Sequence, residues 1–379
     1  NPAIGRAERQ QTAKGTGMRT KAALVSARSG KFEISEVDLA ELRDDEVLVR
    51  VVGVGVCHTD LVCRDELYPV RFPAVFGHEG SGVVEKVGAR VTTLRPGDPV
   101  VMSYRACGQC RACRNGDMCH CAAIFESNFG GGRADGTATI SHEGAPIFGN
   151  FFNQSSFAAF ALANEANTVK VPADLPLALL APLGCGIQTG AGAVINVLRP
   201  PAGSSIAVFG CGAVGLAAIM AAAAVGCTSI VAVEPHQARR DLAMDLGATL
   251  ALDPGRVEVV AEIHKLGGMD YSLECTGLPA VFRQAVDCLT VPGFCAVAGA
   301  APLGTEVTLD MNSIMFGRTV MGIVEGGAVP KNFIPKLTEL YRQGRLPLEK
   351  IVRFYAFDDI NQAVSDAETG KVVKAVLTF

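Results

Sequence analysis

The sequence predicts an α/β protein in which a doubly wound parallel sheet accompanies a second, mostly β domain. Three observations support this prediction. The first hundred residues contain short alternating apolar runs separated by Gly, Pro and Asp, as strands and turns do. Residues 204–322 instead alternate short β-branched runs with apolar helical stretches, as parallel sheets require. Glycine reaches 42 residues and apolar residues 49%, which favours tightly packed α/β units.

The elements follow from their local patterns. In the first half, alternation predicts strands over 21–26, 46–52 and 82–87, and a turn at Pro96-Gly97-Asp98 leads into a strand at 99–102. In the second half, strands are expected over 206–209, 230–233, 270–274 and 294–299, with a helix over 280–289. The C-terminal segment predicts amphipathic helices over 330–344 and 358–367 and a closing strand over 374–379.

Composition narrows the class of partner. The formal net charge is −4 and the charges are scattered, so neither nucleic acid nor an acidic polymer is an expected partner, whereas a small neutral ligand is. Five of the thirteen cysteines lie between positions 107 and 121. This clustering indicates metal binding in a reducing compartment, and we expect a cytoplasmic protein.

Two segments allow a second interpretation. Residues 1–17 lack apolar periodicity and are interpreted as a tag remnant or disordered extension, with a basic targeting arm as the alternative. Residues 204–234 are almost uncharged and by hydropathy alone could span a membrane. Glycines at 210, 212, 215 and 226 divide this stretch into strand, helix and strand, so we expect a buried βαβ unit and no membrane partner.

A glycine-rich turn predicts a dinucleotide site of the Rossmann type. Gly210, Gly212 and Gly215 follow a strand and open a helix, which suits a tight turn, close approach to a pyrophosphate, and helix–strand packing. Glu234 ends the next strand, where a carboxylate binds ribose hydroxyls and repels a 2'-phosphate, favouring NAD over NADP. Arg239 and Arg240 lie close by and could offset part of that repulsion, so NADP remains an alternative. Ala213 and Val214 complete the predicted cofactor loop.

A cysteine-rich loop predicts a structural zinc site. Cys107, Cys110 and Cys113 are spaced so that their thiolates can converge on one tetrahedral ion. Either Cys119 or Cys121 could supply the fourth ligand by loop length. A site closed by four thiolates has no position for substrate, so its role would be structural.

Three further residues are candidate ligands of a catalytic zinc: Cys57, His78 and Cys185. His78, followed by Glu79, lies between two glycines, and Cys185 lies in a tight turn just ahead of the dinucleotide unit. The three residues offer one nitrogen and two sulfur ligands from separate segments. Such a set leaves a fourth position open for substrate.

With these motifs the chain resembles the zinc-dependent alcohol dehydrogenases of the medium-chain dehydrogenase/reductase superfamily over residues 18–379. The aryl-alcohol (benzyl alcohol) branch is the most similar, on four stretches: Phe151 to Phe157, Pro182 to Gly190, Val324 to Gly327 and Phe354 to Asn361. The resemblance implies a GroES-like catalytic domain over 18–186 with a C-terminal return over 328–379, and a Rossmann NAD-binding domain over 187–327. It also implies two zinc ions per chain and a homo-oligomer, with a tetramer favoured over a dimer.

The resemblance assigns the zinc ligands. Cys57, His78 and Cys185 match the catalytic ligands, while Cys107, Cys110, Cys113 and Cys121 match the structural ones, which leaves Cys119 without a role. Asp60 matches a carboxylate that orients the ligating histidine, as such partners do on physical grounds. Glu79 matches a glutamate behind the zinc.

The implied reaction is the reversible oxidation of a primary aromatic or allylic alcohol to its aldehyde, with hydride transfer to NAD. Thr59 is placed to bind the alcohol oxygen and pass its proton toward solvent. The position that usually carries the terminal relay histidine is Val62, which cannot carry a proton. We therefore expect His58 to contact the cofactor pyrophosphate and to serve as the alternative base.

The remaining implied site residues are Thr189, near the nicotinamide, Lys374, at the pyrophosphate, and Tyr104, either lining the substrate pocket or simply packing. Related enzymes that act on terpenoid alcohols or on hydroxymethylglutathione are alternatives. The glutathione adduct would require a basic residue in the pocket, for which Arg64, Arg105 and Arg133 are candidates. A member that has lost catalysis and only binds NAD is the third alternative.

Overall fold

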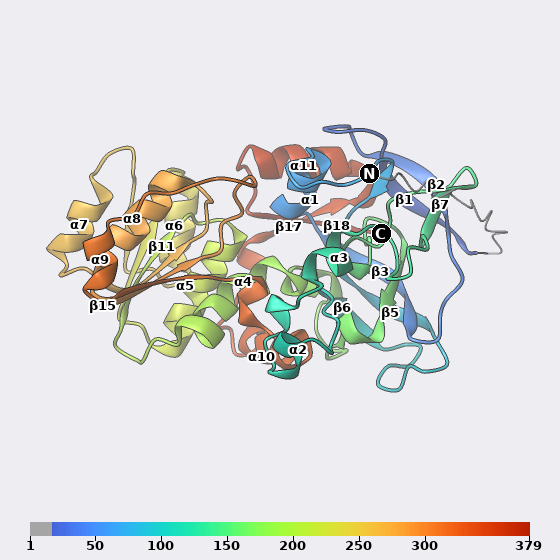
Figure 1. Ribbon diagram of the computed structural model, residues 1–379, viewed down its shortest axis with the longest axis horizontal. Coiled ribbons are helices and arrows are strands. Elements are labelled where there is room, and N and C mark those ends of the chain that lie inside the picture. The colour runs from blue at the N-terminus through green and yellow to red at the C-terminus, as the bar shows by residue number, and fades with distance from the viewer. Residues whose placement is uncertain (1–16) are drawn as a thin grey trace, which may run out of the picture.

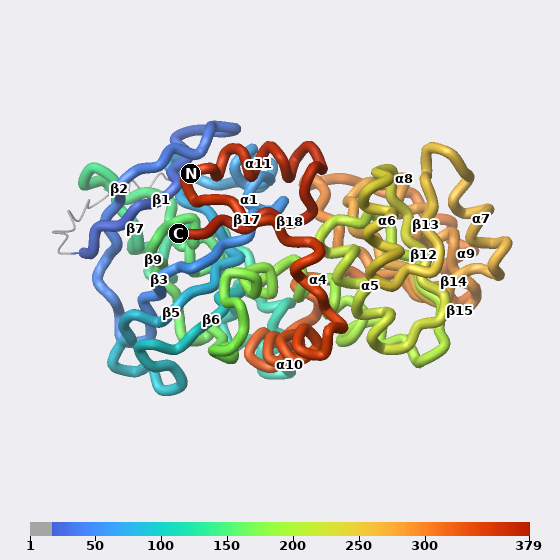
Figure 2. Tube along the Cα trace, turned by 180° about the vertical axis from the view of Figure 1, so that it is seen from behind, coloured from blue at the N-terminus to red at the C-terminus, as the bar shows by residue number. Residues whose placement is uncertain are grey.

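The computed structural model describes residues 17–379, which form two lobes side by side (Figure 1). The predicted extension at 1–17 lies outside the described residues except for Gly17. One lobe contains a parallel sheet from the later half of the chain, and the other contains the strands of the first half. Figure 2 shows the C-terminal segment leaving the parallel-sheet lobe and returning across the junction to the other.

The parallel-sheet lobe has six strands in the order β13-β12-β11-β14-β15-β16. Their bounds are Leu250–Leu252, Ser229–Val233, Ser205–Phe209, Met269–Glu274, Leu289–Val297 and Arg318–Gly322. The helices of this lobe are α5 (Ala213–Val225), α6 (Gln237–Asp245), α7 (Val259–Lys265), α8 (Pro279–Asp287) and α9 (Met311–Met315). The predicted doubly wound sheet is confirmed.

The second lobe has two sheets. One has the order β4-β1-β2-β7-β8, with bounds Ala74–Val75, Arg19–Val25, Glu33–Leu39, Ile140–His142 and Ala145–Pro146. The other has the order β10-β6-β5-β3-β18-β17, with β9 also paired to β3. Its bounds are Thr168–Lys170, Pro99–Met102, Glu79–Val87, Glu46–Gly55, Lys374–Thr378, Val352–Ala356 and Phe160–Asn164. The C-terminal strands therefore complete a sheet begun by the first hundred residues.

Helices connect or flank the two lobes. The segment from η4 (Leu177–Gly184) through α4 (Gly186–Gly192) to η5 (Ala193–Leu198) leads into the parallel sheet, and η6 (Glu325–Gly327) leads out of it to α10 (Pro330–Arg342). The remaining helices are α1 (His58–Arg64), α2 (Arg111–Arg114), α3 (Ile124–Phe129) and α11 (Ile360–Glu368). Pro330 begins α10, where its missing N–H is not needed.

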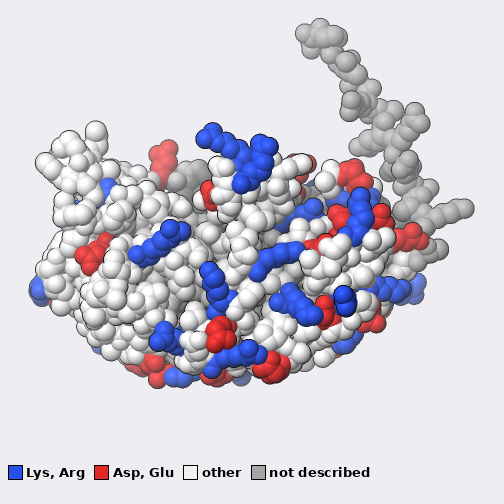
Figure 3. All heavy atoms as spheres, turned by 90° about the horizontal axis from the view of Figure 1, so that it is seen from below, with Lys and Arg blue, Asp and Glu red and all other residues white. Residues whose placement is uncertain are grey.

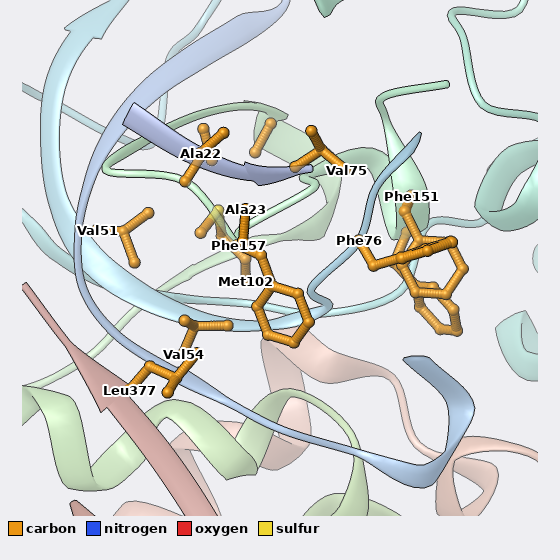
Figure 4. Close-up of a cluster of buried hydrophobic side chains, with 14 of the residues drawn as sticks. Ala22, Ala23, Val51, Val54, Val75, Phe76, Met102, Phe151, Phe157 and Leu377 are labelled. Carbon is orange, nitrogen blue, oxygen red and sulfur yellow. The ribbon is translucent and has the colours of Figure 1, made fainter. Parts of the chain in front are cut away.

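The core of the second lobe is rich in aromatic residues. Phe76, Phe151 and Phe157 are fully buried with residues of β1, β3 and β18 (Figure 4). Phe76 and Phe151 meet edge to face with ring centroids 5.3 Å apart, a favourable arrangement. Phe151 also contacts His78, so this core directly supports a candidate site residue.

Two sequence predictions need correction. The helix predicted over 280–289 ends at Asp287, and the strand predicted from Phe294 begins at Leu289, because Leu289 already pairs with Met269 across an irregular register.

Residues 204–234 form strand, helix and strand, as expected. Within residues 17–379, no single helix combines the length and apolar composition of a membrane span; one bent pair, 177–184 with 186–198, meets these criteria jointly.

Candidate active site and metal centres

The first candidate centre gathers ligands from three segments. Cys57 follows β3 and precedes α1, His78 and Glu79 lie at the start of β5, and Cys185 lies between η4 and α4. One ligand atom from each of these four residues lies within 4.8 Å of the others. All four lie where β3 ends and β5 begins, next to the helix α4 that leads into the parallel-sheet lobe.

Asp60 orients the His78 ring. Its fully buried carboxylate lies 2.8 Å from His78 Nδ1 and accepts hydrogen bonds from the backbone N–H groups of Gly77 and Cys57. When Nδ1–H donates to a carboxylate, Nε2 keeps its lone pair free to bind a metal. These contacts support the role predicted for Asp60, whose effect on a zinc-bound His78 stays a prediction.

The donor set fits a metal ion. His78 Nε2 is buried and has no hydrogen-bond partner among the described residues, which is costly for a polar atom unless something else binds it. A hydrogen bond from Cys185 and the nearby charges of Lys374 and His78 hold the pKa of the Cys57 thiol well below its usual value, despite burial. A thiolate and a free imidazole nitrogen are ligands that zinc prefers.

Glu79 and Lys374 form a buried ion pair behind this centre. Lys374 Nζ lies 2.9 and 3.0 Å from the Glu79 carboxylate oxygens and also donates to the Val56 carbonyl. Burial raises the pKa of Glu79 to about 7, although Lys374 opposes the shift. A Cβ built on Gly186 would meet both Lys374 Nζ and the Ala213 side chain within 4 Å, so Lys374 lies near the dinucleotide loop. Its predicted contact with a pyrophosphate stays a prediction.

The second candidate centre is a cluster of four thiols: Cys107, Cys110, Cys113 and Cys121. Backbone N–H groups of Cys107 and Ala123 donate to Cys121 Sγ at 3.3 and 3.4 Å. The N–H groups of Cys113 and Ala122 lower the pKa of Cys110 to about 6. These hydrogen bonds stabilise thiolates, which is the form that binds zinc.

Cys119 lies outside this four-thiol cluster, which resolves the alternative left open by loop length. Its buried thiol instead donates to Asp117 Oδ1 at 3.3 Å, and His120 Nδ1 lies 3.5 Å away. Burial raises the pKa of Cys119 to about 12, so its thiol stays protonated unless a metal binds.

The glycine-rich turn has the geometry of a dinucleotide loop. Gly210 adopts a φ of 91°, which favours glycine, and a Cβ on Gly215 would lie 1.9 Å from the Gly210 carbonyl oxygen. Glu234 is buried at the end of β12, and its carboxylate accepts hydrogen bonds from the N–H groups of Cys211 and His236. The carboxylate is thereby held beside the loop, as a ribose ligand must be.

The two arginines near Glu234 differ in whether their guanidinium groups are already paired within the protein. Arg240 donates to the carbonyls of Glu234 and Pro235 and lies 3.0 Å from Asp253, so its charge is already paired. Arg239 Nε is buried without a hydrogen-bond partner among residues 17–379. The predicted cofactor role of Arg239 remains a prediction.

The predicted proton-transfer residues lie at the start of α1. Thr59 is half-buried, and its hydroxyl oxygen lies 3.8 Å from Cys57 Sγ, next to the metal ligands. His58 is exposed and Val62 is buried. On the other side of the centre, Thr189 is 9% exposed on α4, where its N–H donates to the Cys185 carbonyl.

Tyr104 packs rather than opening toward a ligand. Its ring is 2% exposed, and its hydroxyl donates to the Ala328 carbonyl at 2.5 Å. Of the two roles considered for Tyr104, the contacts favour packing, because the polar end is already satisfied inside the protein.

Sequence reasoning missed the aromatic residues that do lie at the centre. Phe152 stacks on the His78 ring at 4.4 Å between centroids, and Phe129 of α3 contacts Phe152 edge to face at 5.1 Å. Phe152 has a φ of 50°, which is strained for a bulky residue and directs the ring at an unusual angle from the chain. The stretch Phe151 to Phe157 supported the family resemblance, but no local pattern indicates that one of its rings touches a metal ligand.

Sequence reasoning also missed Glu325, a buried carboxylate in η6. Burial raises the pKa of Glu325 to about 7, while His78, Gln188 and Cys185 oppose that shift. Gln188 Nε2 donates to its carboxylate at 3.0 Å. An isolated Glu between Val324 and two glycines carries no signal of burial, so only the three-dimensional contacts identify it.

Comparisons with known proteins agree with this geometry. Residues 43–173 match the family described as alcohol dehydrogenase GroES-like domain, and residues 213–342 match that of zinc-binding dehydrogenase. The geraniol dehydrogenase of Castellaniella defragrans is 45% identical over 364 residues, covering 95% of this chain and 97% of the relative. The crystal structure of benzyl alcohol dehydrogenase from Acinetobacter calcoaceticus is 45% identical with a TM-score of 0.93, covering 96% of this chain and 99% of that one.

A crystal structure of an alcohol dehydrogenase zinc-binding domain protein from Burkholderia ambifaria is also similar, with 50% identity and a TM-score of 0.94, covering 96% and 99% of the two chains. These similarities span both lobes and both candidate metal centres. The chain therefore belongs to the zinc-containing alcohol dehydrogenases of the medium-chain dehydrogenase/reductase superfamily, which use NAD(P) as the hydride acceptor.

Proposed function

We propose that this enzyme reversibly oxidises a primary aromatic or allylic alcohol to its aldehyde, with hydride transfer to NAD. The observation that carries the substrate class is the pair of aromatic rings next to His78: Phe152 stacks on the imidazole, and the half-buried Phe129 contacts Phe152. Flat, conjugated alcohols stack favourably on such rings. The similarity to a benzyl alcohol dehydrogenase and a geraniol dehydrogenase supports the same class.

Cys57, His78 and Cys185 are the residues that would hold the catalytic zinc, and Cys107, Cys110, Cys113 and Cys121 those that would hold the structural one. Zinc supplies a Lewis acid that lowers the pKa of a hydroxyl group. The Asp60 carboxylate keeps His78 in the tautomer that can bind it. Glu79, paired with Lys374, places a buried charge pair directly behind the ligands.

Thr59 is the group we assign to the alcohol proton. Its hydroxyl lies beside Cys57 and can accept one proton while donating its own. The next acceptor must be reachable from solvent, and Val62 offers none. His58 is exposed and adjacent to Thr59 in sequence, so we assign proton release to its imidazole, together with its predicted contact with the cofactor.

NAD is favoured over NADP by the surroundings of Glu234. NAD accepts the hydride on its nicotinamide ring. The buried Glu234 carboxylate suits ribose hydroxyls, and a 2'-phosphate beside it would be repelled. Of the two arginines near Glu234, Arg240 is engaged by Asp253 and by backbone carbonyls and is not free to bind a phosphate, so Arg239 is the counter-charge that NADP would need.

The hydroxymethylglutathione alternative is disfavoured by the arginines it would need. Arg133 is paired with Glu46, and Arg64 is paired with Asp65 and Glu368. Arg105 is largely buried beside Asn153, and burial lowers its pKa. A non-catalytic NAD-binding role is disfavoured by the complete ligand set; a zinc content near one per chain instead of two would support it.

A homo-oligomer is expected, with a tetramer favoured over a dimer. Strand β16 is at the edge of the parallel sheet, and large apolar side chains of the same region are exposed: Val291, Leu303, Met311, Met315 and Phe316. On the face seen in Figure 3, this lobe shows fewer charged side chains than the other lobe. Exposed apolar surface of this kind is typical of subunit contacts.

All thirteen cysteines are free thiols, which supports a reducing compartment such as the cytoplasm.

The test of the proposed function is a comparison of four alcohols. NAD reduction is followed at equal enzyme concentration with benzyl alcohol, geraniol, ethanol and hydroxymethylglutathione, and each rate is repeated with NADP. We expect kcat/KM to be highest for benzyl alcohol or geraniol with NAD. Equal, weak rates on all four substrates would contradict the proposed substrate class.

A further inference from the structure

Glu325 belongs to the loop that leaves the parallel sheet after β16. The residue is only 7% exposed although it carries a carboxyl group, and its backbone has a φ of 50°, in the left-handed region. A buried carboxylate in a strained backbone conformation is unfavourable unless its contacts compensate. The question is therefore what this carboxylate binds.

Its partners are the Cys185 thiol, which hydrogen-bonds to it, and Gln188, three residues after Cys185 in the first turn of α4. Gln188 Nε2 lies 3.0 Å from Glu325 Oε2 and 3.1 Å from Ser103 Oγ. Ser103 Oγ in turn donates to the carbonyl of Gly184, the residue before Cys185, at 2.7 Å. A chain of buried hydrogen bonds thus runs from Glu325 to the turn that carries the Cys185 thiol.

The backbone of the loop that contains Glu325 also packs against α4. A Cβ built on Gly326 would lie 2.3 Å from the Gln188 carbonyl oxygen, so the two segments are in direct contact. Asn196 Nδ2, farther along the chain, also donates to the Gly326 carbonyl at 3.1 Å. Two side-chain contacts therefore fix this loop. Glu325 fixes it close to Cys185, and Asn196 fixes it farther from Cys185.

We propose that Glu325 is a positioning residue for hydride transfer, which through Gln188 fixes the Cys185 turn relative to the loop that leaves the dinucleotide sheet. This inference rests on the proposed function, in which Cys185 holds the catalytic zinc. Hydride transfer requires the alcohol carbon and the nicotinamide ring to be within about 3–3.5 Å, and a displacement of 1 Å can cost about 100-fold in rate. In the proposed function the Cys185 turn would hold the alcohol through zinc, and the Glu325 loop follows the last strand of the sheet that carries the glycine-rich turn.

The Glu325 carboxyl group is suited to this role because it accepts the Gln188 N–H inside the protein, where a hydrogen bond is stronger than in water. Glu325→Gln keeps the length and one acceptor oxygen, whereas Glu325→Leu removes the bond and leaves Gln188 without this partner. Asn196→Ala is the matched control, since it removes a side-chain hydrogen bond to the neighbouring residue of the same loop without touching the Cys185 turn.

The experiment measures kcat, KM for both substrates and the kinetic isotope effect with α-deuterated benzyl alcohol for these three variants, at verified zinc content and melting temperature. We expect kcat to fall about 100-fold in Glu325→Leu and about 10-fold in Glu325→Gln, with KM values changed less than about threefold. The isotope effect on kcat should rise in both, because hydride transfer becomes slower than product release. Asn196→Ala should retain the wild-type isotope effect.

A second readout is independent of turnover. With cobalt(II) in the catalytic site, the sulfur-to-metal absorption bands report on the Cys185 thiolate, and we expect them to shift in both Glu325 variants but not in Asn196→Ala. Wild-type kcat and wild-type bands in a folded Glu325 variant would overturn the proposal, as would identical changes in Asn196→Ala. If Glu325→Leu does not fold, Glu325→Gln decides by the same criteria. If the wild type oxidises no alcohol, the proposed function fails, and the cobalt bands still test the position of Cys185.

Discussion

Replacing Asp60 by Asn should release the catalytic zinc while preserving the fold. The Asp60 carboxylate is fully buried and receives three hydrogen bonds, from His78 Nδ1 at 2.8 Å, Cys57 N at 3.0 Å and Gly77 N at 3.1 Å. An Asn side chain has nearly the same shape but only one acceptor atom. If that oxygen stays with His78 and Gly77, the amide NH₂ faces the Cys57 N–H group, and two donors oppose each other.

The expected magnitude follows from this geometry. A buried donor left without its acceptor costs about 1–3 kcal/mol. Loss of a carboxylate behind a ligating histidine typically weakens metal binding 10- to 100-fold, equivalent to about 1.4–2.7 kcal/mol. Both routes give the same range, so zinc affinity at this centre should fall by one to two orders of magnitude.

The assay is zinc content by mass spectrometry after dialysis against a graded chelator, together with kcat/KM. Asp60→Asn should retain one zinc per chain under conditions in which the wild type retains two. Glu46→Gln is the control, because Glu46 is also a buried carboxylate with hydrogen bonds to Arg133 and Arg43 but belongs to neither centre. Two tightly bound zincs in Asp60→Asn would refute the reasoning.

Four further outcomes are expected. Cys121→Ser should lose the structural zinc and melt at a lower temperature, whereas Cys119→Ser should keep two zincs per chain. The reverse pattern in a metal analysis would show that Cys119, and not Cys121, is the fourth ligand. Glu234→Ala should raise the KM for NAD about 10-fold and lower that for NADP, because the ribose hydroxyls lose a partner while the repulsion of a 2'-phosphate is removed; steady-state kinetics with both cofactors checks this. Phe152→Leu should lower kcat/KM for benzyl alcohol about 2- to 13-fold and that for ethanol less, since an aromatic contact is worth about 0.5–1.5 kcal/mol; a parallel loss on both alcohols would argue against stacking. His58→Gln should weaken NAD binding and move the pH profile of kcat, and an unchanged profile with unchanged NAD affinity would remove both roles of His58.

Local patterns were sufficient to predict the parallel sheet, the dinucleotide loop and the cysteine-rich loop. Each of these is encoded by neighbouring residues: the glycines at 210, 212 and 215 by turn geometry, and Cys107, Cys110 and Cys113 by chelate spacing. Family resemblance added Cys57, His78 and Cys185, which lie 128 positions apart at their extremes and share no local pattern. Their convergence is produced by the sheets and by the turn before α4.

Contacts across the fold could not be predicted in the same way. Whether Phe152 stacks on His78 depends on a strained backbone angle, and whether Glu325 meets Gln188 depends on how two segments 137 positions apart pack. Tyr104 was left between two roles for the same reason, since only the Ala328 carbonyl near its hydroxyl distinguishes them. The sequence therefore does not predict the role of a residue that depends on a partner far away in the chain.

Zinc-edge anomalous diffraction from crystals of the enzyme with NAD tests most directly whether the buried centre at His78 holds the catalytic metal. Two anomalous peaks per chain are expected, one among the four thiols of the cysteine-rich loop and one at coordination distance from Cys57 Sγ, His78 Nε2 and Cys185 Sγ. The second peak should be absent from crystals of a chelated enzyme that has lost alcohol oxidation and should return with activity on adding zinc. An active enzyme without a peak at His78 Nε2 would contradict the account.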